Sequence, residues 1–367
     1  MVRPILALTC ILWAIPAIPA LAQTPSTNAA ATPDSPPAQA STLAARSTLV
    51  LVPALVRNKD GELVYTLKAN DFVLTDDGIP QKLTLEQDSG GEPLALVIDI
   101  EGGRSALHEL KKFVAIGPMI DSIVGNVPHQ VAVVGFDSLP VLVTDFSPDT
   151  ATAAQGIEDL ISDNNGDDGA AILDSLGFSI DILRRQPPQY RRAILLISET
   201  NGDSSKLQLN DALRIVSDTN TAIYSVGFST GKSEAKKIWA QRKSDPPPPP
   251  DCNGCFSLWP EIRMAEMATI VAVDGLRRNV PETVARLTGG EYFQFGDEKS
   301  LEASLQTISN HIPNRYMLSF QPQSPHPGFH PITLQIPDYV NLKVSARNGY
   351  WAGVSGAAPG PAKDAPR

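Results

Sequence analysis

The sequence predicts an α/β protein with a mainly parallel sheet, joined to a smaller unit made of β-strands. Between residues 93 and 312, short apolar stretches alternate with amphipathic ones, which is typical of parallel strands covered by helices on both faces. Outside this region, residues 47–90 and 314–352 hold β-rich stretches separated by turn residues. We expect these two flanking segments to combine into one small β-sandwich-like unit around the α/β region.

Residues 1–22 have the pattern of a signal peptide. Arg3 supplies positive charge, Ile5–Ile18 is mostly apolar, and Ala20-Leu21-Ala22 is a small-x-small cleavage pattern. The short apolar core argues against a membrane anchor, and no later stretch reaches the length of a membrane-spanning helix. We therefore expect an exported protein, periplasmic or extracellular, with no membrane span after signal cleavage.

The composition predicts two disordered segments and excludes one class of partner. Residues 23–45 and 353–367 are rich in small and Pro residues, which predicts a disordered linker and a disordered tail. The formal net charge is -10, which argues against nucleic acid because phosphates require a basic face. The partner is therefore expected to be a protein ligand, which the sequence does not identify.

The strands are predicted from apolar runs and from alternation of polar and apolar residues. In the N-terminal β segment they are Ser47–Val56, Leu63–Leu67, Asp71–Thr75 and Gln81–Gln87. In the α/β region they are Leu94–Ile100, Val131–Phe136, Pro140–Thr144, Ala193–Ile197, Ala222–Phe228 and Tyr292–Phe295. In the C-terminal β segment they are Tyr316–Phe320, Pro331–Ile336 and Leu342–Ala346.

The helices are predicted where apolar residues recur every three or four positions. They are Leu107–Val124, 150–161, 170–185, Leu207–Ser217, Glu282–Leu287 and Lys299–Ile312. A Pro-rich insertion, 230–260, interrupts the alternation of strands and helices.

Acidic residues follow two of the predicted buried strands. Asp99 and Glu101 end the first strand of the α/β region, two glycines follow them, and Glu199 ends the fully apolar strand 193–197. Ligands of open α/β sheets bind at the carboxyl ends of the strands. The sequence therefore predicts a candidate cation site from Asp99, Glu101 and Glu199.

Motifs along the chain resemble a known family. Residues 93–312 resemble a von Willebrand factor type A domain, which implies a Rossmann-like fold. In the flanks, Leu67, Asn70-Asp71-Phe72, Asp76-Asp77-Gly78 and Gln81 resemble the signature L-x-x-x-D-F-x-x-x-x-D-G-x-x-Q of the VWFA-related acidobacterial family. The stretches Arg315–Phe320 and Ala346–Tyr350 are also similar to that family.

The resemblance implies a metal-ion-dependent adhesion site, but the chain departs from its pattern of Asp-x-Ser-x-Ser, a Thr and a later Asp. Glu101 and Gly103 stand where the two Ser residues are expected, Ala170 replaces the Thr, and Glu199 replaces the Asp. We therefore expect a degenerate site without a cofactor. If a divalent cation binds, an irregular carboxylate site favours Ca²⁺ or Mn²⁺ over Mg²⁺, with help from Asp167, Asp168 or Asp203.

The insertion carries further candidate residues. Cys252 and Cys255 form a Cys-Asn-Gly-Cys motif, for which a local disulfide is the expected state in an exported protein. Trp239, Phe256 and Trp259 are candidate partner-binding residues, since aromatic side chains are enriched at interfaces. The alternative is that these aromatic side chains hold the loop against the sheet.

Catalytic motifs are not recognised in the sequence, and we expect no enzyme. The five histidines show no His-Glu-x-x-His spacing, and His326 and His330 are expected to be solvated in a Pro-rich turn. The sequence thus predicts an exported, non-enzymatic module for protein interaction or adhesion. The alternatives are a cation-dependent adhesin that uses the acidic site and a secreted hydrolase with an unrecognised site.

Overall fold

The structure is a computed structural model of the chain. It describes residues 49–86, 92–111, 116–163, 166–200, 204–228, 260–323 and 326–353. All of them belong to one of two units of the chain, Ser47–Arg367.

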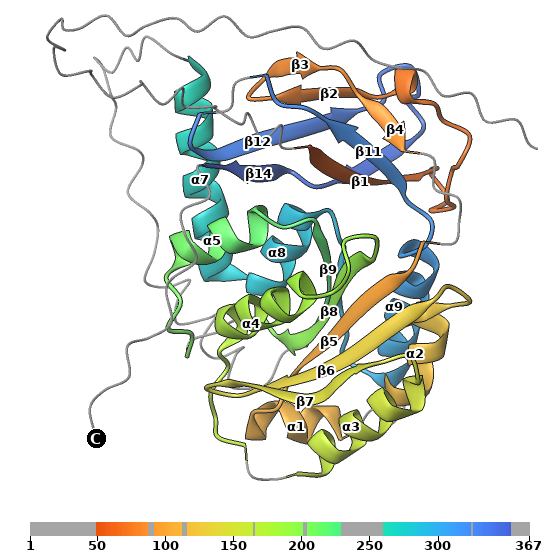
Figure 1. Cartoon of the computed structure of the whole chain (residues 1–367), viewed down its shortest axis with the longest axis vertical. Helices are drawn as coiled ribbons and strands as arrows, with labels where there is room; N and C mark the ends of the chain where they lie inside the picture. The colour runs from red at the N-terminus through yellow and green to blue at the C-terminus, as the bar shows by residue number, and fades with distance from the viewer. Residues whose placement is uncertain are drawn as a thin grey trace, which may run out of the picture. The chain divides into compact units, whose positions relative to one another are not determined.

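The α/β region is built on a six-stranded sheet with the strand order β10-β9-β8-β5-β6-β7 (Figure 1). All neighbouring strands in it are parallel except β7, which runs antiparallel to β6. The central strand β5 is buried along its whole length, which explains its nearly continuous apolar sequence. The strands are β5 (Leu94–Glu101), β6 (His129–Phe136), β7 (Pro140–Ser147), β8 (Arg191–Glu199), β9 (Thr221–Phe228) and β10 (Tyr292–Gln294).

Helices cover both faces of this sheet (Figure 1). Side chains alternate along β5, so Leu96 and Ile98 join a core with α1, α2, α3 and α9 on one face. Ala95 and Val97 join a second core with α4, α5, α7 and α8 on the other. The helices are α1 (Arg104–Leu110), α2 (Ile116–Val124), α3 (Thr150–Ser162), α4 (Ile172–Arg184), α5 (Leu209–Ser217), α7 (Pro260–Arg278), α8 (Val280–Thr288) and α9 (Glu298–His311).

The flanking segments form two antiparallel four-stranded sheets, with orders β13-β1-β11-β4 and β14-β12-β2-β3. Each sheet mixes strands from both ends of the chain, and the two share one apolar core. The fold class predicted from the sequence is thus confirmed. The strands are β1 (Val50–Arg57), β2 (Val73–Asp76), β3 (Ile79–Gln81), β4 (Thr84–Glu86), β11 (Tyr316–Phe320), β12 (Gly328–Gln335), β13 (Lys343–Ala346) and β14 (Gly349–Ala352).

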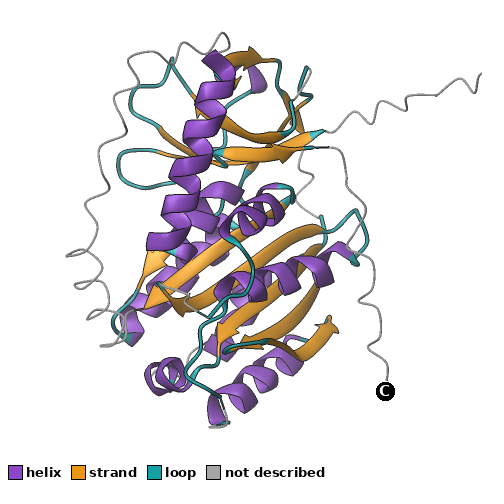
Figure 2. Cartoon of the chain, turned by 90° about the vertical axis from the view of Figure 1, so that its left-hand side faces the viewer, coloured by secondary structure: helices purple, strands orange, loops and turns teal. Residues whose placement is uncertain are grey.

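Two local predictions are wrong, and one helix was not predicted. The single helix 107–124 is two helices, and α2 begins at Ile116 because Pro118 fits the first turn of a helix but not its interior. Residues 63–67 form no strand: only Leu63 bridges to Arg57, and the Tyr316 hydroxyl binds the backbone of Val64 and Leu67. The helix α7, which the sequence analysis did not predict, packs against β12, α5 and α8 (Figure 2).

Two buried arginines connect the β-sandwich to the α/β region. Arg347 donates hydrogen bonds to the carbonyl oxygens of Leu51, Ser217, Thr219 and Gly349, at 2.7 to 3.5 Å. Burial lowers the pKa of Arg347 to about 10. Because Leu51 lies in β1 and Ser217 ends α5, this one side chain crosses the junction between the two parts.

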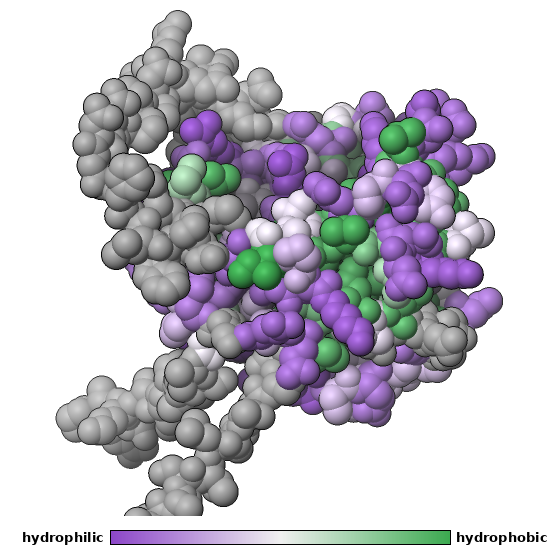
Figure 3. Space-filling view, turned by 90° about the horizontal axis from the view of Figure 1, so that it is seen from above, coloured by the Kyte–Doolittle hydropathy of each residue, from purple (hydrophilic) through white to green (hydrophobic). Residues whose placement is uncertain are grey.

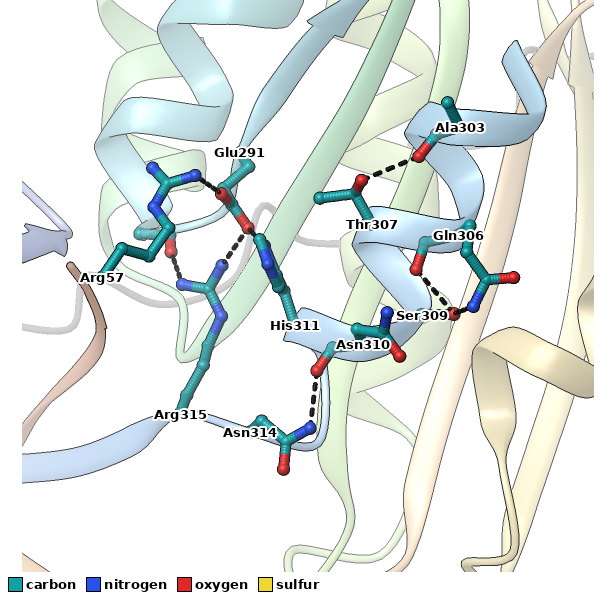
Figure 4. A network of polar contacts seen from close by, with 11 residues as sticks. Arg57, Glu291, Ala303, Gln306, Thr307, Ser309, Asn310, His311, Asn314 and Arg315 are labelled. Carbon is teal, nitrogen blue, oxygen red and sulfur yellow. Dashed lines mark hydrogen bonds and ion pairs between the residues drawn. The ribbon is translucent and has the colours of Figure 1, made fainter. Parts of the chain in front are cut away.

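The second arginine, Arg315, belongs to a network around Glu291 (Figure 4). Glu291 binds Arg315 at 3.1 Å, His311 at 2.6 Å and, through its other oxygen, Arg57 of β1 at 3.4 Å. Burial opposes ionisation of this carboxyl, but the hydrogen bond from His311 and the nearby positive charges outweigh it and lower the pKa of Glu291. The stretches 315–320 and 346–350, which carry the family resemblance, therefore supply two structural arginines.

Candidate functional site

The candidate site lies at the carboxyl ends of β5, β6 and β8, where the loops that follow these strands meet. Asp99 is fully buried, and its carboxylate accepts hydrogen bonds from the hydroxyls of Ser175 at 2.6 Å and Ser179 at 3.0 Å. Both serines lie four residues apart on α4, so they present one face to the strand. Burial raises the pKa of Asp99 to about 7, although the two hydroxyls oppose this shift.

Glu101 and Glu199 are brought together at the ends of β5 and β8. Glu101 is 3% exposed, and its Oε2 accepts a hydrogen bond from the backbone N–H of Glu199 at 2.6 Å. Within the described ranges, however, Asp99, Glu101 and Glu199 do not form a cluster whose ligand atoms all lie within 4.8 Å of one another. A cation site on these three residues stays a prediction.

The loop after β5 packs directly against the loop before α4. A Cβ atom on Gly103 would lie 2.8 Å from the carbonyl oxygen of Gly169, and one on Gly166 would lie 2.3 Å from that of Gly102. Real Cβ atoms do not approach backbone oxygens this closely. A serine at position 103, as the adhesion-site pattern requires, therefore has no room in this arrangement.

Hydrogen bonds join these loops to one another. The N–H of Arg104 donates to the carbonyl oxygen of Asp167 at 2.8 Å, and that of Ala171 donates to Asp137 at 2.7 Å. The carboxylate of Asp167 accepts from Ser138 and from the N–H of Gly169, and these bonds lower its pKa. Asp174 accepts from the backbone N–H groups of Lys206 and Leu207 and holds the next loop in the same way.

The sequence pattern indicates this edge of the sheet but not most of the residues that build it. Ser175 and Ser179 carried a usable signal, because two serines four residues apart lie on the otherwise apolar face of α4. Asp168 is exposed, whereas Ala170 and Ala171 are buried. Asp203 and the insertion residues, namely the predicted disulfide Cys252 and Cys255 and the predicted contacts Trp239, Phe256 and Trp259, lie outside the described residues.

An apolar cavity opens beside these loops, between β7 and α3. Its volume is about 410 Å³, and its walls include Leu107, Val143 and Leu160, while Asp137, Asp159 and Asp163 add negative charge. β7 is the last strand at its end of the sheet. Its side of the cavity carries exposed apolar side chains: Leu139 is 54% and Val141 60% exposed.

Exposed apolar side chains also occur together on α7, where Met267, Ile270 and Val271 are 64%, 67% and 70% exposed. On the face shown in Figure 3, apolar residues form small groups surrounded by hydrophilic ones. Exposed apolar residues of the β-sandwich segments include Val73 and Ile79. The β7 edge differs from these other surfaces because its exposed apolar residues adjoin a cavity, which makes it the stronger candidate for a contact surface.

The chain was compared with known families, curated proteins and solved structures. No protein-family profile matches the sequence, and no curated protein is similar to it. Solved structures similar to it include the conserved hypothetical protein BatB from Bacteroides thetaiotaomicron, with 16% identity over 60% of this chain and 97% of that one and a TM-score of 0.37. Another is the vWF domain of the type V pili tip protein Mfa5 from Porphyromonas gingivalis, with 12% identity over 60% of this chain and 95% of that one and a TM-score of 0.38.

A third similar structure is the PilB minor pilin from Streptococcus sanguinis, with 12% identity over 62% of this chain and 63% of that one and a TM-score of 0.40. These similarities concern the fold alone. The strand order, with β7 as the single antiparallel strand, and the helices on both faces give the α/β region the fold of a von Willebrand factor type A domain. No helix in the described part of the chain is long and apolar enough to cross a membrane.

Proposed function

We propose that the protein is an exported, non-enzymatic interaction module of the von Willebrand factor A type, with a degenerate adhesion site. The close packing of Gly103 against Gly169 carries this proposal. The backbone of Gly169 occupies the space that a serine side chain at position 103 would need. The surrounding loops are held by hydrogen bonds to one another. Partner binding then needs no cation at this edge.

The contact surface is the edge formed by Leu139 and Val141 together with the neighbouring cavity. An edge strand can bind an extended segment by main-chain hydrogen bonds, while pockets select its side chains. The cavity here is apolar and is lined by Asp137, Asp159 and Asp163. The expected occupant is therefore an extended segment of a partner protein that carries apolar and basic residues.

The proposal is tested by capturing partners from the exported proteins of the source cells, with and without chelator. Val141→Lys should abolish capture of a given partner, because it places a charge in the apolar contact. Val340→Lys is the control, since Val340 is 90% exposed and lies away from this edge. Capture that survives Val141→Lys, or that is lost in chelator, would contradict the proposal.

Calorimetry distinguishes this proposal from the main alternative, a cation-dependent adhesin that uses Asp99, Glu101 and Glu199. The titration with Mg²⁺, Mn²⁺ or Ca²⁺ uses the Asp77→Asn variant. In this variant a second group of possible ligands in the β-sandwich, Asp77 with His326 and His330, contributes no heat. Heat at millimolar ion that disappears in Glu101→Gln would favour the adhesin. No heat is expected if the loops are closed as described.

A further inference from the structure

The β-sandwich contains a buried cluster of two aspartates and two histidines that takes no part in the loop edge. Asp76 ends β2 and Asp77 begins the turn to β3, while His326 precedes β12 and His330 lies within it. The sequence-based expectation of solvated histidines is wrong for His330, which is 1% exposed; Asp76 and Asp77 are 7% and 9% exposed. Buried ionisable groups of this kind need partners.

The proton positions follow from the neighbouring carbonyl groups. His330 Nε2 lies 2.7 Å from the carbonyl oxygen of His326, and His326 Nδ1 lies 3.3 Å from that of Pro327. Carbonyl oxygens only accept, so both of these nitrogens carry hydrogen. In the neutral rings, His330 Nδ1 and His326 Nε2 then bear lone pairs, and they face Asp77 Oδ2 at 2.6 and 3.5 Å.

Three lone-pair-bearing atoms therefore face one another with no hydrogen between them in the neutral state. A proton on His330 Nδ1 would satisfy one contact. It would leave other atoms unsatisfied, because Asp76 Oδ1, Asp77 Oδ1 and His326 Nε2 are all buried without a hydrogen-bond partner. A metal cation at this point would serve several of these atoms at once.

We propose that Asp77, His326 and His330 bind a divalent transition-metal ion of the Zn²⁺ type. Asp76 lies beside this group, with its Oδ1 3.8 Å from His330 Nδ1, and a water molecule would complete the coordination. Tetrahedral Zn²⁺ has bonds of about 2.0–2.1 Å, which place neighbouring ligand atoms roughly 3.3 Å apart. The separations of 2.6 and 3.5 Å from Asp77 Oδ2 to the two histidine nitrogens lie around this value, and imidazole with carboxylate favours Zn²⁺ over Mg²⁺ or Ca²⁺.

The surroundings resemble the outer shell of a metal site. The backbone carbonyl groups that bind the two rings fix which nitrogen is free, as is usual for metal-binding histidines. Tyr350 stacks on His330 at 4.9 Å and donates a hydrogen bond to Asp76 Oδ2 at 2.9 Å. His326 also stacks on His330, at 4.1 Å. Ion binding requires it to tilt outwards, which its partly exposed position permits.

The ion would cross-link the two ends of the chain. Asp77 and His330 are 253 residues apart in sequence, and they belong to the N-terminal and C-terminal segments that build the sandwich. Metal binding that requires the folded arrangement contributes to folding stability. The site is therefore inferred to be structural, and it is separate from the loop edge of the sheet.

The test uses the full chain without an affinity tag, stripped of metal and titrated with Zn²⁺ by calorimetry. One ion per chain is expected at this site, together with a rise in melting temperature that Mg²⁺ and Ca²⁺ do not produce. Co²⁺ should give the visible absorption of a four-coordinate site. His326→Ala and Asp77→Asn should each weaken Zn²⁺ binding by at least about 100-fold, while His108→Ala, at an exposed histidine, should not.

The variants are chosen to remain folded. His326 is partly exposed, and Asn tolerates the left-handed backbone conformation of Asp77, where φ is 51°. Their melting temperatures in chelator should match that of the unmodified chain. Absence of Zn²⁺ binding by the unmodified chain would overturn the proposal. Binding of undiminished affinity in both variants would place the ion elsewhere and would overturn it as well.

Discussion

Replacing the buried carboxyl of Asp99 tests whether the centre of the candidate site holds a proton or a cation. The pKa of Asp99 is raised from 3.8 to about 7 by burial. In the unfolded chain this carboxyl ionises near pH 4, whereas in the folded protein it keeps its proton to about pH 7. Stability is therefore lost as pH rises between these values. A difference of about three pKa units corresponds to about 4 kcal/mol.

The perturbation is Asp99→Asn, which mimics the protonated acid. Its Oδ1 can accept from Ser175, and its amide can donate to the Ser179 hydroxyl, so both hydrogen bonds persist. Denaturant unfolding at pH 5 and at pH 8 gives the two free energies. At pH 5 the unfolded carboxyl is already ionised, so only about two of the three pKa units fall between the two assay pH values. We expect the unmodified protein to lose about 2.5 kcal/mol through this group between pH 5 and pH 8, and we expect the variant to lack this loss.

The control is Asp181→Asn, at an exposed position of the same helix, where the side chain is 65% exposed. It should leave the pH dependence caused by Asp99 in place. The reasoning fails if the unmodified protein is equally stable at both pH values, or if Asp99→Asn is the less stable chain at pH 8. The second result, with destabilisation by chelator that persists when Asp77 is replaced by Asn, would show a cation on Asp99, because that chain lacks a ligand of the sandwich cluster.

Three further predictions concern packing and the junction. Gly103→Ser should not create Mg²⁺ binding and should destabilise the fold by about 2 kcal/mol, measured by denaturation, because its Cβ meets a backbone oxygen. Arg347→Met should cost about 4 kcal/mol by leaving buried carbonyl oxygens unpaired, whereas Arg286→Ala, in a surface ion pair with Glu282, should cost at most ~0.5 kcal/mol. Glu291→Gln should cost roughly 3 kcal/mol at pH 7. Since the pKa of Glu291 is lowered, its contribution is present above about pH 4.3 and is lost as pH falls through the folded pKa, so the difference between the two chains should shrink in acid. Equal costs for Arg347→Met and Arg286→Ala, or a difference for Glu291→Gln that does not change with pH, would contradict these assignments.

Much of the fold was predictable because burial leaves a direct pattern in the sequence. The strand Leu94–Glu101 is apolar until its last residues, and its neighbours alternate with amphipathic helices. The helix α7 was missed because the Pro-rich stretch 246–250 suggested that the irregular region continued. Nothing local to Val64 reveals that the Tyr316 hydroxyl, rather than a neighbouring strand, satisfies its carbonyl group.

The candidate site was less predictable, because tertiary contacts decide what each residue does. The acidic character of Asp99 and Glu101 is visible in the sequence, but their partners are distant: Ser175 on α4 and the N–H of Glu199 on β8. The close approach of Gly103 to another loop has no signal in a single sequence. His330 was misjudged for the same reason, since its buried position depends on Asp77, far away in the chain.

The positions of the two proposed sites keep their tests independent. The sandwich meets the α/β region through Ser217, Thr219, Gly289 and Glu291, which precede β9 and β10 and so lie at the amino ends of these parallel strands. The loops after β5, β6 and β8 lie at the carboxyl ends, on the opposite edge of the sheet. A Zn²⁺ ion held by Asp77 would therefore stabilise the sandwich without touching the loop edge. If chelation lowers the melting temperature while partner capture through β7 persists, the metal belongs to the sandwich, and the interaction edge works without it.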